Sequence, residues 1–144
     1  MAYATQQQFI DIFGLEETIQ LTNLEDPTAT TVNSTVMAAA LEQAADEMNP
    51  YLARRYALPF ALVPGSLVGC NLDIARYLLD NNDTRENVIK RRDDRFAFLE
   101  DVAKGLVDLD VPADEEDETA GEVLVSAPER IFTSTTLHQF AGDI

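Results

Sequence analysis

Residues 33–52 read NSTVMAAALEQAADEMNPYL, and they carry the strongest helical periodicity in the chain. Four apolar residues recur there at helical spacing and define one face: Met37, Leu41, Ala44 and Met48. Asn33 or Ser34 supplies the side-chain oxygen that caps the first turn. Pro50 has no backbone N–H, and its ring clashes with the carbonyl four residues earlier, so we expect this helix to kink or break near Asn49.

A shorter helix is expected before this long one. Thr5 and Gln8 have the spacing of a capping box, and Gly14 is suited to end a helix of about residues 6–13. Residues 15–21 are long enough for one or two further helical turns.

Two more helical patterns follow the long helix. Residues 66–79 carry two adjacent apolar stripes, which predicts a largely buried helix. Thr84 is placed to cap a helix that runs to Lys104 and ends at Gly105. The expected fold class is therefore all-α, a small bundle of about four helices. Five residues are expected to be buried at its centre: Leu41, Leu52, Ile74, Leu78 and Leu99.

The pattern changes after Gly105, so we expect residues 1–105 to form the helical core and residues 106–144 to form an extended acidic arm. Polar and apolar residues alternate over 106–111, and residues 123–125 are again apolar, which indicates short β segments in the arm. Residues 114–118 are five consecutive acids that repel one another and must stay solvated.

Length and composition limit the possible functions. A chain of 144 residues with 46% hydrophobic content supports one compact core. The net charge of −16 argues against free, non-specific binding to nucleic acid or to an anionic membrane, because both need positive surface. No apolar run approaches the length of a membrane span, so no membrane partner is expected.

The residue types that carry chemistry are scarce. Cys70 and His138 are the single cysteine and the single histidine, so they form neither an intramolecular disulfide nor a Cys/His metal cage. Cys70 lies among apolar neighbours and is interpreted as a small buried hydrophobe. The five-acid run lacks the fixed spacing and glycine turn of a calcium loop. We therefore expect no enzyme activity, no metal and no cofactor.

Charge is distributed in three blocks along the chain. Residues 1–53 contain eight acids and no base, residues 54–104 contain eight acids and nine bases, and residues 105–144 contain ten acids and one base. A near-neutral middle between acidic ends favours self-association. The basic residues around position 91 are interpreted as partners in ion pairs within a helix or between subunits, in preference to a DNA-reading helix. Four arginines of the middle block are expected to meet acids of an adjacent copy: Arg54, Arg55, Arg91 and Arg95.

The order of several blocks resembles the family of phage Mu-type neck proteins and, behind it, the helical head-to-tail connector proteins of tailed phages. The most specific block is Tyr51-Leu52-Ala53-Arg54-Arg55-Tyr56-Ala57-Leu58-Pro59. Four other parts of the chain carry the rest of the resemblance: residues 3–14, residues 19–22, residues 73–78 and the terminal residues Pro128, Arg130, Phe132, Thr133, Leu137 and Phe140. The loop 25–30 lacks the glycine that similar sequences often have there, so no metal role is carried over.

The resemblance implies a structural virion protein of the phage neck, an adaptor or head-completion subunit that forms a ring of twelve copies. It implies a portal protein on one side, a tail or stopper protein on the other, and DNA that passes through the lumen without specific binding. The implied location is the virion neck, and the host cytoplasm during assembly. Five residues of the arm are expected to contact a neighbouring subunit or the portal: Arg130, Ile131, Phe132, Leu137 and Phe140. The alternative hypothesis is a small acidic regulatory or DNA-mimicking protein that occupies a basic protein surface.

Overall fold

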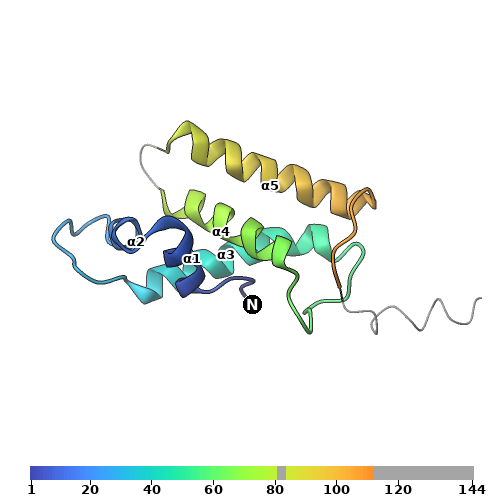
Figure 1. Ribbon diagram of the computed structural model, residues 1–144, viewed down its shortest axis with the longest axis horizontal. Coiled ribbons are helices and arrows are strands. Elements are labelled where there is room, and N and C mark those ends of the chain that lie inside the picture. The colour runs from blue at the N-terminus through green and yellow to red at the C-terminus, as the bar shows by residue number, and fades with distance from the viewer. Residues whose placement is uncertain (81–83, 112–144) are drawn as a thin grey trace, which may run out of the picture. The chain divides into compact units, whose positions relative to one another are not determined.

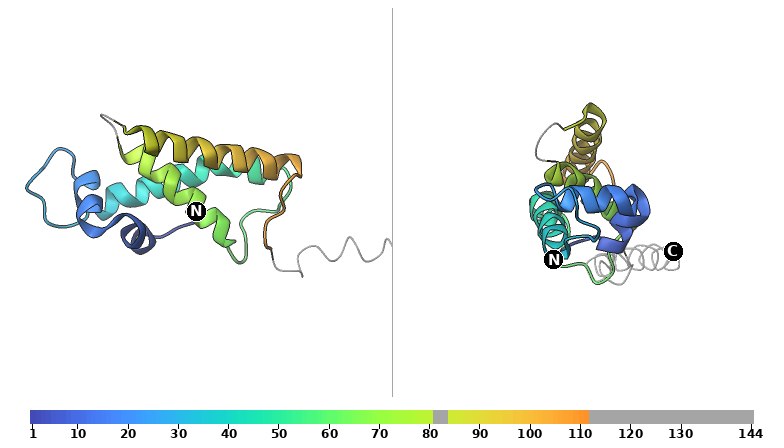
Figure 2. Two further views of the ribbon diagram at one scale, coloured as in Figure 1. Left: turned by 45° about the horizontal axis from the view of Figure 1, so that its top comes forward. Right: turned by 90° about the vertical axis from the view of Figure 1, so that its left-hand side faces the viewer.

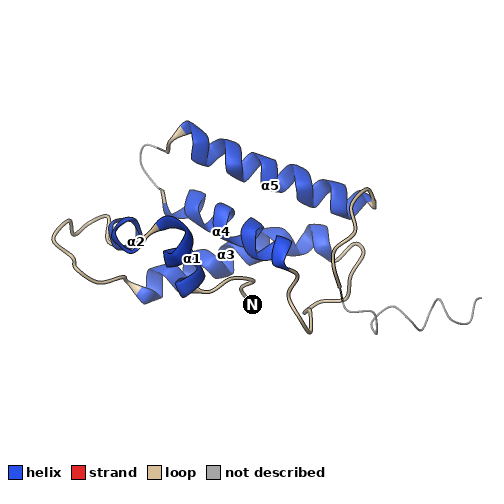
Figure 3. Cartoon of the chain, in the orientation of Figure 1, coloured by secondary structure: helices blue, strands red, loops and turns tan. Residues whose placement is uncertain are grey.

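The computed structural model describes residues 1–80 and 84–111, and Met1–Asp110 forms one compact unit. The described residues contain α-helices joined by loops, with no strand among them (Figure 3). The helices are α1 (Gln6–Phe13), α2 (Leu15–Thr22), α3 (Ser34–Leu52), α4 (Gly65–Leu79) and α5 (Glu86–Lys104) (Figure 1). The predicted all-α class is confirmed. None of these helices has the length and apolar content needed to cross a bilayer.

The capping box at the beginning of α1 is confirmed. Gln8 donates its backbone N–H to Thr5 Oγ1 at 3.2 Å, and Thr5 donates its N–H to Gln8 Oε1 at 2.9 Å. Gly14 ends α1 with a φ of +96°, which turns the chain directly into α2. Because α2 is a complete helix of two turns, this part of the chain holds five helices, one more than the sequence predicted. Both short helices pack against α3 (Figure 2).

The long helix α3 begins as expected and ends later than expected. Asn33 Oδ1 accepts the backbone N–H of Val36 at 3.2 Å. The helix continues through Pro50 to Leu52, so the predicted break near Asn49 does not occur. Pro50 lies in the last turn, where its ring removes a single helical hydrogen bond, and the N–H of Ala53 still donates to the Asn49 carbonyl at 2.8 Å.

The hydrophobic centre lies where α4 packs between α3 and α5 (Figure 1). Four of the five residues predicted to be buried are buried: Leu41, Leu52, Ile74 and Leu99. The prediction for Leu78 is wrong, because Leu78 is only half-buried and Leu79 is buried in its place. Both apolar stripes of α4 are buried over most of their length, and Leu78, in the last turn of the helix, lies at the edge of the core.

The beginning of α5 differs from the sequence prediction, whereas its end agrees with it. Thr84 does not cap the helix, because its hydroxyl donates to the Asp80 carbonyl at 3.0 Å, and α5 begins after Arg85 without a side-chain cap. The other end is as predicted. Gly105 adopts the left-handed conformation, with a φ of +86°, and ends the helix.

The compact unit continues beyond the predicted boundary at residue 105. Leu109 is buried, and its N–H donates to the Tyr56 hydroxyl at 2.9 Å. Residues 106–110 therefore pack on the helical unit as irregular chain. The predicted strand segment 123–125 and the acidic run 114–118 lie outside the described residues.

Candidate functional site

The first charged cluster joins α4 to α5 through Asp73, whose side chain is only 7% exposed. Arg95 donates from Nε to Asp73 Oδ2 at 2.6 Å, and Arg91 places its Nε 3.7 Å from Asp73 Oδ1. The guanidinium of Arg95 lies over Gly69, where a Cβ atom would come within 3.1 Å of Nη2. Two of the four arginines predicted to contact another subunit thus bind a carboxylate of their own chain.

Arg55 fastens the end of α3 to the end of α5. Its Nη1 donates to the carbonyls of Val102 and Val107, each at 3.1 Å, and its Nη2 contacts Asp108 Oδ1 at 2.7 Å. Arg55, the third of the four arginines predicted to contact another subunit, therefore uses its donors on the end of α5 and on the segment that follows it.

Arg54 differs from its neighbour in having no ion pair among the described residues. It is exposed, and it lines a surface hollow of about 450 Å³ together with Glu47, Tyr51 and Phe96. The rings of Tyr51 and Phe96 lie with their centroids 5.9 Å apart and form the aromatic part of this hollow. Of the four predicted arginines, Arg54 is the one with a free guanidinium in the described structure.

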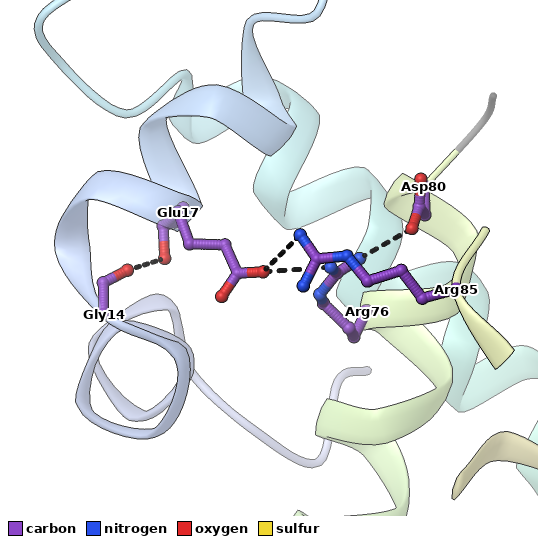
Figure 4. Close-up of polar contacts among 6 residues, drawn as sticks. Gly14, Glu17, Arg76, Asp80 and Arg85 are labelled. Atoms are coloured by element: carbon purple, nitrogen blue, oxygen red, sulfur yellow. Dashed lines mark hydrogen bonds and ion pairs between the residues drawn. The ribbon is translucent and has the colours of Figure 1, made fainter. Parts of the chain in front are cut away.

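A second charged cluster was not predicted from the sequence, and it joins α2 to α4 (Figure 4). Arg76, with 5% of its side chain exposed, donates to Glu17 at 2.9 Å and to Asp80 at 3.2 Å. Arg85 also approaches Glu17, at 3.9 Å. The i, i+4 spacing of Arg76 and Asp80 was a visible signal, whereas Glu17 lies 59 residues away from Arg76 in the chain, and nothing in the sequence connects the two.

A hollow of about 460 Å³ opens between α2, the loop that follows it and α3, with the end of α4 also contributing to its lining. Its apolar lining includes Leu21, Leu24 and Val36, and its polar lining includes Glu25 and Asp26. The hollow therefore presents apolar and acidic side chains on one surface.

The burial of Cys70 confirms the interpretation from the sequence, although the Arg95 guanidinium also lies near the thiol. The side chain is fully buried, and burial raises the pKa of the thiol to about 11. A thiol with this pKa is almost entirely protonated at neutral pH and is a poor nucleophile. Within residues 1–80 and 84–111, no group of three or more His, Cys, Asp or Glu side chains is placed to hold a metal ion.

The predicted contact residues of the arm cannot be located in the same way. Arg130, Ile131, Phe132, Leu137 and Phe140 all lie outside the described residues, as does His138.

Comparison with known proteins assigns the family. The model of the family described as "Bacteriophage Mu, Gp36" matches residues 3–127. This chain belongs to the bacteriophage Mu Gp36 family. A Gp36 relative from Haemophilus influenzae, the Mu-like prophage FluMu protein gp36, is 32% identical over 114 residues, which is 79% of each chain.

The Gp36 family match covers every structural feature described above. Residues 3–127 include every helix that the structure describes, both charged clusters and the two surface hollows. The match ends before Arg130, so the five arm residues predicted to be contacts lie beyond it.

Proposed function

We propose that this Gp36 family protein is a structural subunit of the phage neck, a connector that forms a ring between the portal and the tail. The observation that carries the proposal is its membership of the bacteriophage Mu Gp36 family. The resemblance to neck proteins described from the sequence supplies the ring, the twelve copies and the passage of DNA through the lumen. In this role the protein is not an enzyme, and it acts in the virion after assembly in the host cytoplasm.

The use of charge inside the helical unit supports a structural role. Arg55 joins the end of α3 to the end of α5 at the surface, whereas Asp73 and Arg76 each fasten one helix to another through short ion pairs of a largely buried side chain. Charged groups paired in this way are costly to separate, because breaking the pair leaves a buried charge without its partner. Such contacts keep the helices in fixed register, which suits a subunit of a load-bearing joint.

The acidic surface supports the passage of DNA. The first 53 residues carry eight acids and no base. If many copies present this surface toward a lumen, the phosphate backbone is repelled and the DNA slides, whereas a basic lining would hold it.

Two experiments test the proposal. A phage from which the gene for this protein is deleted should accumulate filled heads and separate tails. A plasmid copy of the gene should restore joined particles. Quantitative mass spectrometry of normal particles should find the protein in ring-like copy number relative to the portal protein. If purified particles do not contain the protein, the neck proposal is wrong, and the acidic regulatory or DNA-mimicking alternative is favoured.

A further inference from the structure

Leu106 is an exposed apolar side chain on a fixed turn. The N–H of Gly105 donates to the Val102 carbonyl at 3.1 Å, and the N–H of Leu106 donates to the Asp101 carbonyl at 2.9 Å. This pair of hydrogen bonds is the Schellman motif, which holds the backbone of Leu106 in one place. Even so, the side chain of Leu106 is 73% exposed.

The sequence before Leu106 explains this exposure. In a Schellman motif the residue after the glycine commonly packs on an apolar residue in the last turns of the helix. The corresponding positions of α5 are Glu100 and Asp101, and neither offers Leu106 an apolar surface. The motif therefore presents Leu106 outward, and Lys104, just before the turn, is exposed with no ion pair among the described residues.

The hollow between α2 and α3 is complementary to Leu106 and Lys104, because its lining is partly apolar and partly acidic. Leu24 and Val36 line it and are 46% and 37% exposed, respectively, so two apolar side chains are accessible in one depression. Asp26 also lines it, and the hydroxyl and N–H of Thr28 donate to its carboxylate at 2.6 Å and 3.0 Å. These hydrogen bonds lower the pKa of Asp26 and keep its negative charge in place.

The two features lie at opposite ends of the helical unit. The loop between α2 and α3 is at the left of Figure 1, the turn after α5 is at the right, and Figure 2 gives the same order. A chain therefore cannot place Leu106 in its own hollow. A second copy of the chain can do so, and its Lys104 then arrives beside the acids of that hollow.

We propose that Leu106 of one copy docks into the hollow lined by Leu24 and Val36 of the next copy, with Lys104 facing Glu25 and Asp26. Because the two surfaces are different, the contact is head-to-tail, and its repetition closes a ring or extends a filament. Fixing Leu106 beforehand reduces the entropy lost on binding. The inference rests on the proposed ring, for which it names the contact between neighbouring copies.

Disulfide trapping tests this contact in the full-length protein. On a Cys70→Ala background, Leu24→Cys and Leu106→Cys variants are prepared separately, mixed and oxidised. Head-to-tail docking should give a disulfide between the two different variants and little between identical ones. A double variant with both cysteines should form a ladder of covalent oligomers. Leu62→Cys is the matched control for Leu106→Cys, because Leu62 is 67% exposed and lies in a different loop.

Matched charge substitutions provide a second measurement. Leu106→Asp should weaken self-association by roughly ten- to a hundredfold in sedimentation experiments, because a buried leucine is lost. Leu62→Asp should leave association unchanged, and both variants should melt like the parent protein. If the parent protein stays monomeric in solution, the same cysteine pairs are oxidised in purified particles.

Several results would overturn the inference. Disulfides between identical variants would show a symmetric contact. Equal effects of Leu106→Asp and Leu62→Asp on self-association would show that Leu106 does not lie in the contact between copies. A disulfide from position 24 to a Phe132→Cys variant, with none to Leu106→Cys, would assign the hollow to the C-terminal segment. Particles that contain the protein but give no disulfide between Leu24→Cys and Leu106→Cys would overturn the contact while leaving the neck role intact. Absence of the protein from particles would instead overturn the proposed function itself.

Discussion

Arg95 reaches across from α5 and donates to the buried Asp73 carboxylate of α4 at 2.6 Å, with its guanidinium lying over Gly69. The absence of a side chain at Gly69 lets the guanidinium approach closely, because a Cβ atom there would lie 3.1 Å from Nη2, a tight contact that the arginine would have to relieve by a small shift. A glycine in a helix interior costs about 1 kcal/mol relative to alanine. At Gly69 this cost is offset by the close approach of the Arg95 guanidinium, which joins α5 to α4.

The first prediction concerns this ion pair. Replacing Arg95 with alanine leaves Asp73 buried with only the more distant Arg91, so the free energy of unfolding should fall by about 1–2 kcal/mol in urea titrations. Lys90→Ala is the control on the same helix, because the Lys90 and Asp94 side chains are 77% and 65% exposed. Exposed pairs contribute little, so this variant should unfold like the parent protein. Equal effects of the two substitutions would contradict the structural role of Asp73.

A second prediction compares two neighbouring residues of α4. Ile74→Ala should lower the free energy of unfolding by about 2–5 kcal/mol, because Ile74 is fully buried and the surrounding side chains fill the space only in part. Leu78→Ala should cost clearly less, because Leu78 is half-buried. Thermal or urea denaturation of both variants measures the difference. A larger loss for Leu78→Ala would mean that α4 is rotated relative to this description.

The third prediction is a pH dependence that arises from Cys70. Burial raises the pKa of this thiol from 9.0 to about 11, so between these values the folded chain binds more protons than the unfolded chain does. Stability must therefore fall as the pH rises through this window, and it should be unaffected by Cys70 below about pH 8. The parent protein and a Cys70→Ala variant, unfolded in urea from pH 7 to 11, should differ in this slope. Identical slopes would show that the thiol titrates normally.

The two adjacent arginines at the end of α3 lead to a fourth prediction. Arg54→Glu should weaken self-association, because Arg54 has no ion pair among the described residues, and it should leave thermal stability unchanged. Arg55→Glu should instead lower the melting temperature, because it removes the donors to Val102, Val107 and Asp108. Light scattering at low and high salt measures association, which should weaken as salt screens the exposed charges. Association that is indifferent to salt and to Arg54→Glu would assign the contact to apolar surfaces.

The fifth prediction concerns the C-terminal residues 128–144, which lie beyond the family match. Their deletion should leave the helical circular dichroism spectrum intact, because every described helix ends by Lys104. Incorporation into particles should be lost, because the arm carries the apolar anchors predicted from the sequence. Truncated protein that enters particles in normal amount would remove Ile131, Phe132, Leu137 and Phe140 from the set of contact residues.

The sequence alone was sufficient for the features that depend on neighbours along the chain. The capping box at Thr5, the cap at Asn33 and the glycines that end α1 and α5 all involve residues within a few positions of each other. Helical periodicity likewise identified Leu41, Leu52, Ile74 and Leu99 as core residues. Even the local failures have local causes: Thr84 bonds backward to Asp80, and Pro50 falls in the last turn of α3, where its effect is small.

The tertiary structure alone decided which charges meet between helices, because those ion pairs depend on how the helices pack. The sequence predicted that Arg55, Arg91 and Arg95 would contact another subunit, yet the fold brings Asp108 and Asp73 to them within the chain. It also brings Glu17 to Arg76, 59 residues away, where a low local dielectric strengthens the attraction. Periodicity identifies the face of a helix that turns inward, whereas the partner of a charged side chain depends on rotation and register between helices.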